Sequence, residues 1–135
     1  MNRCWLLLIL LFVFLPGGGC SKEKVVSVEP PPIDKQKLLV GEWRFEDEKQ
    51  HILVSYVFRP NGTFSSELRQ NGEQVRKLEG LWTLEGDKLV YTYTKDSLGQ
   101  GDGLKERDRL VRIDDSSYTI ESGDKAQRTY FRVKS

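Results

Sequence analysis

From residue 41 to the C-terminus, hydrophobic and polar residues alternate with a period of two, as in strands that bury one face. The first stretch, 41–46, places Trp43 and Phe45 on the same face. Turn-forming pairs such as Asn61-Gly62 and Asn71-Gly72 separate the stretches, because Asn and Gly tolerate positive φ. We expect strands at 41–46, 51–59, 63–70, 73–84, 88–95, 104–113, 117–122 and 126–133.

One stretch breaks the alternation. Val75 is out of phase with Trp82 and Leu84, which predicts a bulge near Lys77. The only helical signal precedes the first strand, where Asp34 is placed to cap a single turn over 35–40. The predicted fold class is therefore all-β, a single small antiparallel up-and-down barrel, whose closure removes both sheet edges. An open sandwich with the same strands is the alternative.

The N-terminus has a different pattern. Residues 4–15 carry no charge and follow Met1-Asn2-Arg3. This run is shorter than the ~20 residues that a membrane-spanning helix needs. It matches the apolar region of a secretory signal, which we favour over a permanent membrane helix. Residues 20–37 include Pro30-Pro31-Pro32 and predict a semi-rigid, extended linker to a domain at 38–135.

The chain has two cysteines, and Cys4 lies within the presumed signal. An exported chain would keep Cys20 alone, so no intramolecular disulfide forms. The stretch 15–21, Leu-Pro-Gly-Gly-Gly-Cys-Ser, resembles a bacterial lipoprotein signal, with Gly17 where that family usually has an aliphatic residue. The resemblance implies cleavage after residue 19, a lipid anchor on Cys20 and a place in the bacterial cell envelope. Ser21 favours the outer membrane, and a secreted protein cleaved nearby is the alternative.

Charge excludes one class of partner. Removing residues 1–19 takes away Arg3 and no acidic residue, so 20 of the 21 basic side chains remain against 20 acidic ones. The sequence shows no basic stripe of the kind that neutralises phosphates, and we expect no nucleic-acid partner. It also shows no polybasic patch for anionic lipids, so we expect membrane contact through Cys20.

Three short motifs occur in order along the strands: Gly41-Glu42-Trp43, residues 58–64 (Phe-Arg-Pro-Asn-Gly-Thr-Phe) and residues 80–89 (Gly-Leu-Trp-Thr-Leu-Glu-Gly-Asp-Lys-Leu). Together they resemble the small bacterial lipocalin-like lipoproteins. The resemblance implies an eight-stranded barrel over residues 38–133. Larger lipocalins pack an arginine of the last strand across the first-strand tryptophan, and Arg128 and Arg132 are the candidates here.

Catalytic chemistry is not indicated. His51 is the only histidine, and no nucleophile motif accompanies it. Asp96 and Asp102 in the loop 96–103 do not follow a calcium-loop order, which favours a flexible hairpin loop. The alternating charges of residues 105–109 indicate a solvated strand face. We expect no catalytic residue, no metal and no cofactor, and hence not an enzyme.

The aromatic residues on the expected inner face are the candidate site. An eight-stranded barrel either fills with side chains or holds one small ligand, and this many rings favours filling. If a cavity exists, Leu84, Leu89 and Ser66 would join the rings, and a small apolar ligand or a lipid would bind there. A filled barrel would instead be a partner-binding, envelope-structural or protease-inhibitor-like module, with the protein partner unknown. The candidate ligand-binding residues are Trp43, Tyr56, Phe58, Phe64, Trp82, Tyr91 and Tyr93.

Overall fold

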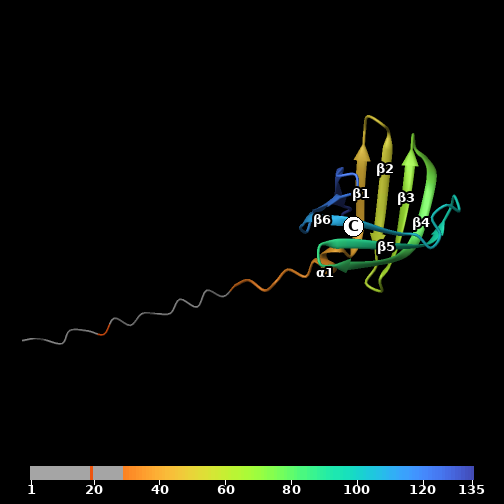
Figure 1. Ribbon diagram of the computed structural model, residues 1–135. Coiled ribbons are helices and arrows are strands. Elements are labelled where there is room, and N and C mark those ends of the chain that lie inside the picture. Colours follow the sequence, from red (N-terminus) through yellow and green to blue (C-terminus); the bar gives the residue numbers. More distant parts are fainter. Residues whose placement is uncertain (1–18, 20–28) are drawn as a thin grey trace, which may run out of the picture. The chain divides into compact units, whose positions relative to one another are not determined.

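The expected strands are all present in a computed structural model that describes residues 19 and 29–135 (Figure 1). One short helix precedes them. The elements are α1 (Lys35–Leu39), β1 (Gly41–Asp47), β2 (Ile52–Phe58), β3 (Thr63–Gln70), β4 (Glu73–Glu85), β5 (Lys88–Asp96), β6 (Lys105–Ile113), β7 (Ser117–Glu121) and β8 (Gln127–Arg132). Each strand pairs antiparallel with the next along the chain, as the short turns between them require.

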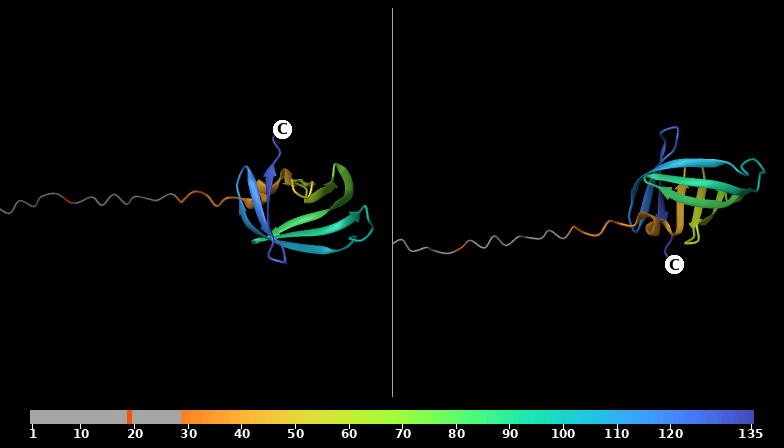
Figure 2. Two further views of the ribbon diagram at one scale, coloured as in Figure 1. Left: turned by 90° about the horizontal axis from the view of Figure 1, so that it is seen from above. Right: turned by 60° about the horizontal axis from the view of Figure 1, so that its bottom comes forward.

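The sheet closes on itself into a barrel, in the order β1 to β8 (Figure 2). The prediction of a closed up-and-down barrel is confirmed, and the open sandwich is excluded. The closing seam is short, because β1 and β8 share only two register pairs, Trp43 with Arg132 and Arg44 with Phe131. By comparison, β1 and β2 share seven.

The predicted bulge near Lys77 is confirmed, and it lies two residues before Lys77. Leu68 pairs with Arg76 and the next residue pairs with Gln74, so Val75 is the extra residue rather than Lys77. A second register shift lies beside Gly80 in the pairing of β4 with β5. A Cβ on Gly80 would collide with the backbone of Thr92, so only glycine fits at this close approach.

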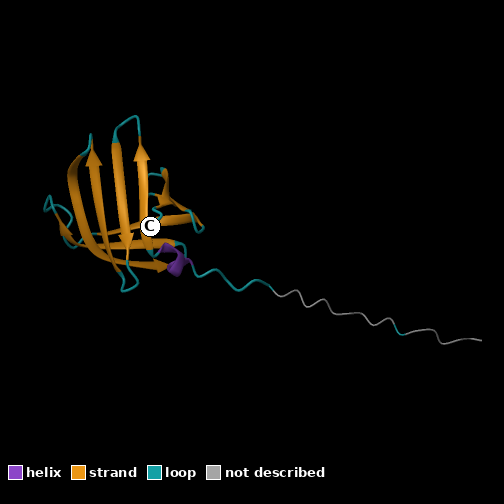
Figure 3. Cartoon of the chain, turned by 180° about the vertical axis from the view of Figure 1, so that it is seen from behind, coloured by secondary structure: helices purple, strands orange, loops and turns teal. Residues whose placement is uncertain are grey.

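Helix α1 lies at one end of the barrel (Figure 3). Asp34 caps it, its side chain accepting a hydrogen bond from the Lys37 amide at 3.2 Å, as predicted. Leu39 is fully buried, and the indole Nε1 of Trp43 donates to the Leu39 carbonyl at 2.8 Å. The first strand and the helix are therefore fixed to each other by a single buried tryptophan.

Arg132, rather than Arg128, packs across this tryptophan. Its guanidinium carbon lies 4.1 Å from the Trp43 ring centroid. The same guanidinium donates to the carbonyls of Leu38 (2.6 Å) and Val40 (3.0 Å), tying the last strand to the helix end. Gly41 adopts a φ of 139°, which residues with a side chain rarely adopt, and this explains the glycine two residues before the tryptophan.

The core fills the half of the barrel next to α1. Phe58 lies between Trp82 and Phe64, with ring centroids 5.2 and 6.3 Å away. Trp43 meets Tyr118 edge to face at 4.9 Å. The predicted filling is thus present in this half. The buried core cluster comprises Leu39, Trp43, Phe58, Phe64, Trp82, Leu89, Tyr91, Tyr93, Leu110, Tyr118, Ile120 and Tyr130.

Several predictions fall on residues outside those that the structure describes. They are the signal over 1–18, the lipid attachment at Cys20 and the linker up to residue 28. Within residues 29–135, no helix is both long and apolar enough to cross a membrane.

Candidate functional site

A cavity of about 390 Å³ opens at the end of the barrel opposite α1. In an up-and-down barrel, the starts of β2, β4, β6 and β8 and the ends of β3 and β5 lie at the same end. All the lining residues come from these segments or from the barrel's middle. They are Val54, Tyr56, Ser66, Leu68, Arg76, Leu78, Tyr93, Glu106, Arg128 and Tyr130. The barrel thus has one filled end and one hollow end.

Strand alternation places these side chains together. Tyr56 pairs with Ser66, and Ser66 pairs with Leu78 on the other side, so the three lie side by side across β2, β3 and β4. Inward positions recur every second residue along each strand. The wall of the cavity therefore mixes aliphatic side chains, aromatic rings and a few polar groups.

All five tyrosines of the chain face the interior, and burial raises the pKa of each. The pKa of Tyr56 rises to about 12. Tyr130 stacks on Tyr118, with ring centroids 4.9 Å apart, and meets Tyr56 edge to face at 5.5 Å. The Tyr118 hydroxyl is buried and has no hydrogen-bond partner among the described residues. The interior therefore holds neutral hydroxyl groups, one of them with its donor unused.

Asp96 organises the loop at the cavity's edge. Arg76 donates to both of its carboxylate oxygens, Nε at 3.1 Å and Nη2 at 2.7 Å. The amides of Leu98 and Gln100 donate to the same carboxylate at 3.0 and 3.2 Å. The Arg76 hydrogen bond is the main reason that the pKa of Asp96 falls to about 2. Both carboxylate oxygens of Asp96, one of the two aspartates considered above for calcium, are thus engaged by the protein, and the loop 97–103 is built around them.

Two carboxylates of β6 also face the interior. Glu106 pairs in register with Tyr91, and Asp108 with the fully buried Leu89. The Tyr93 hydroxyl donates to Glu106 Oε2 at 2.5 Å. Burial and then the charge of Glu106 raise the pKa of Asp108. The prediction that residues 105–109 form a solvated strand face holds for Lys105, Glu106 and Arg107, which are exposed, whereas Asp108 is half-buried on the inner face.

The alternation along β6 already indicates that Glu106 and Asp108 lie on the inner face. Glu106 and Asp108 alternate in step with Leu110, which is buried, so the period-two pattern itself assigns them to the inner face. Charge led to the opposite assignment.

The structure divides the seven aromatic candidates between the two halves of the barrel. Tyr56 and Tyr93 line the cavity. The other five pack in the filled part next to α1: Trp43, Phe58, Phe64, Trp82 and Tyr91. Leu89 belongs to the same packed part, whereas Ser66 lines the cavity as expected.

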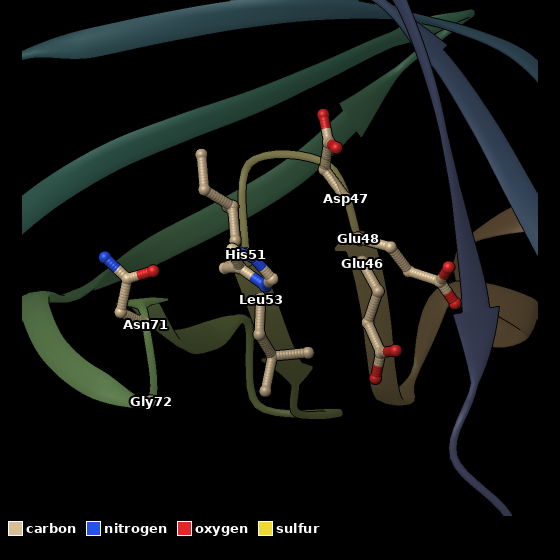
Figure 4. A pocket seen from close by; sticks show the side chains of 8 residues that line it. Glu46, Asp47, Glu48, His51, Leu53, Asn71 and Gly72 are labelled. Atoms are coloured by element: carbon tan, nitrogen blue, oxygen red, sulfur yellow. The ribbon is translucent and has the colours of Figure 1, made fainter.

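A larger depression of about 590 Å³ lies by the β1–β2 hairpin and is lined in part by Glu46, Asp47, Glu48 and His51 (Figure 4). Its acidic side chains do not converge, because Asp47 points away from Glu46 and Glu48 (Figure 4). Asp47 instead accepts hydrogen bonds from the backbone amides of residues 49 and 50. In residues 29–135 no three His, Cys, Asp or Glu side chains group as a metal site would require. We therefore take the barrel cavity as the candidate site.

Comparison with solved structures shows the fold. The chain is similar to a lipocalin-like protein from Bacteroides uniformis, with 18% identity, a TM-score of 0.50, and coverage of 72% of this chain and 99% of that one. It is also similar to a protein from Bacteroides thetaiotaomicron solved by NMR, with 15% identity, a TM-score of 0.52 and coverage of 73% and 92%. No protein-family model and no curated protein matches the sequence. The chain thus has a lipocalin-like barrel fold.

Proposed function

We propose that this protein is a binding protein without catalytic activity, which holds one small organic molecule in the open end of its barrel. The observation that carries the proposal is the cavity of about 390 Å³ at the end opposite α1. Concave sites of roughly 300–1,000 Å³ with apolar walls and a few polar groups are the usual ligand sites of proteins. A lipocalin-like fold supports the same role, since such barrels commonly enclose a ligand.

The size and lining of the cavity narrow the ligand class. The filled half next to α1 leaves only the outer part of the barrel for a guest, so the guest is small rather than a long acyl chain. Val54, Leu68 and Leu78 provide apolar contact, and Glu106 and Arg128 provide charge. We therefore favour a small amphiphilic molecule over the purely apolar guest that the aromatic pattern alone indicates.

Filling the cavity with a side chain tests this role. Val54→Trp places an indole among the lining residues, whereas Val57→Trp places it on the outer face of the same strand, because alternate residues point to opposite sides. Native mass spectrometry of the full chain, released from membranes in lipid nanodiscs, should show a bound small molecule in the wild type and in Val57→Trp. Val54→Trp should lack it. A wild-type protein of unliganded mass would count against the proposal.

We also propose that the protein is exported and anchored to the bacterial envelope by a lipid on Cys20. The support is the apolar run at 4–15 followed by small residues and a single remaining cysteine. Cys20→Ser should move the protein from the detergent phase to the aqueous phase in a phase-separation assay. A serine variant that still partitions with detergent would mean that the uncleaved apolar run is the anchor.

A second candidate function, binding a protein strand, is favoured by the short seam between β1 and β8. Beyond the pair of Arg44 with Phe131, the next facing residues, Phe45 and Tyr130, form no ladder pair. Phe131 is 62% exposed beside a groove of about 470 Å³ along this seam. An exposed edge can accept an added strand. A photo-crosslinking residue at Phe131 should capture one envelope protein, and the same probe at exposed Leu81 should not.

A further inference from the structure

We infer that the barrel cavity selects a small organic cation, an amine carried on an apolar or aromatic body, over a neutral or anionic molecule of the same shape. This inference rests on the proposed ligand-binding function and concerns the same cavity. It follows from the charges that face the cavity and from the rings that surround them.

The charges facing the cavity sum to a negative value. On β4, Arg76 is neutralised by its two hydrogen bonds to Asp96 at the end of β5. On β6, Glu106 lines the cavity, and Asp108 lies on the same inner face one position deeper. Only Arg128 of β8 stands opposite these two carboxylates. Counting Asp108, which lies on the inner face but outside the lining, two carboxylates therefore stand against one arginine that has no acidic partner among the described residues.

Neither carboxylate is already neutralised. Glu106 and Asp108 form no ion pair with any residue in the described part of the chain. The only side-chain donor to Glu106 is the neutral hydroxyl of Tyr93. Asp124, in the turn between β7 and β8, adds a further negative charge near Asp108, while Arg128 offsets part of it. A ligand ammonium would supply the missing positive charge, since hydrogen bonds between a cation and a carboxylate are stronger than those between neutral groups.

The rings around these carboxylates also favour a cation. Tyr56, Tyr93 and Tyr130 line the cavity, and the negative face of an aromatic ring attracts an ammonium group within about 6 Å of its centroid. An anion would meet the same ring faces and two carboxylates with unfavourable sign.

Three probes of one shape test the inference: 2-phenylethylamine, 2-phenylethanol and 3-phenylpropanoate. Their binding to the full chain carrying Cys20→Ser is measured by isothermal titration calorimetry at pH 7. We expect the amine to bind at least tenfold more tightly than the alcohol, and the carboxylate to bind most weakly. If the alcohol or the carboxylate binds as tightly as the amine, the inference fails while the proposed function stands. If none of the three binds, both fail.

Variants of the carboxylates locate the effect. Glu106→Gln and Asp108→Asn should each weaken amine binding about tenfold and leave alcohol binding within about twofold, since only the charged head loses its partner. Glu85→Gln, an exposed glutamate away from the cavity, should change neither. If a carboxylate variant fails to unfold cooperatively, Arg128→Gln replaces it and should tighten amine binding several-fold. Unchanged amine affinity in the folded variants would overturn the inference.

Discussion

Replacing Arg132 by methionine should destabilise the barrel several times more than the same change at an exposed arginine without hydrogen bonds. Arg132 closes the barrel seam at its pair with Trp43 and joins β8 to the carbonyls at the end of α1. Methionine keeps much of the side chain's length and packing but removes all of its hydrogen-bond donors.

The magnitude follows from the contacts. The guanidinium donates to the carbonyls of Leu38 and Val40 at part-buried positions and to that of Asp115 at an exposed one. Counting only the two part-buried hydrogen bonds, discounted for partial solvent access, gives about 2 kcal/mol. The cation–π contact with Trp43 adds about 1 kcal/mol. Arg132→Met should therefore lower the free energy of unfolding by about 3 kcal/mol, or the melting temperature by roughly 15 °C.

Urea unfolding of the full chain, followed by far-ultraviolet circular dichroism, measures this loss. Arg132→Lys should lose about half as much, because it keeps a cation over the ring and one donor but not the planar fork. Arg112→Met is the matched control, an exposed arginine on β6 for which the structure shows no side-chain hydrogen bond within the described residues. Its stability should stay within about 0.5 kcal/mol of the wild type. An Arg132→Met protein as stable as this control would refute the role assigned to the guanidinium.

Three further predictions concern the interior. Asp96→Asn should remove an acid-sensitive part of the stability: the pKa of Asp96 is lowered to about 2, so its stabilisation is present above its ordinary pKa near 3.8 and is lost as pH falls towards 2. The free energy of unfolding of the wild type should then decrease from pH 4 to pH 2, whereas that of the variant should not. At pH 7, proteolysis of the loop 97–103 should be faster in the variant. Burial raises the pKa of Tyr56 from 10.0 to about 12. The free energy of unfolding should therefore be highest below pH 10 and should fall as pH rises from 10 to 12. Spectrophotometric titration should show no phenolate from this residue near pH 10. Tyr118→Phe removes a buried hydroxyl that has no hydrogen-bond partner in the described part of the chain. The melting temperature should therefore stay unchanged or rise. A fall of more than about 5 °C would mean that the hydroxyl is paired in solution.

The strands and their closure could be predicted because local patterns encode them. Alternation assigns each residue to a face, and turns such as Asn71-Gly72 mark where the chain reverses; Asn71 and Gly72 both adopt positive φ. Alternation does not encode height along the barrel. Arg128 and Arg132 have the same phase, and only the pairing of Trp43 with Arg132 decides which of them reaches the tryptophan.

The cavity could not be predicted from the sequence, for the same reason. Tyr56 and Tyr91 both point inward, yet one lines the hollow and the other packs in the core, because strand stagger and side-chain volumes decide where filling stops. The bond between Arg76 and Asp96 joins residues 20 positions apart and depends on the register of β4 with β5. For Asp108, the phase of the strand indicates the inner face, whereas its charge favours a solvated position.

The central claim is that the hollow end of the barrel holds a small molecule. A crystal structure of the protein purified from its native membrane, without added ligand, tests this claim most directly. We predict density for a small organic molecule bounded by Tyr56, Tyr93 and Tyr130, with a polar atom close to Glu106. Density for ordered water alone, or a cavity closed by the side chains around it, would contradict the claim.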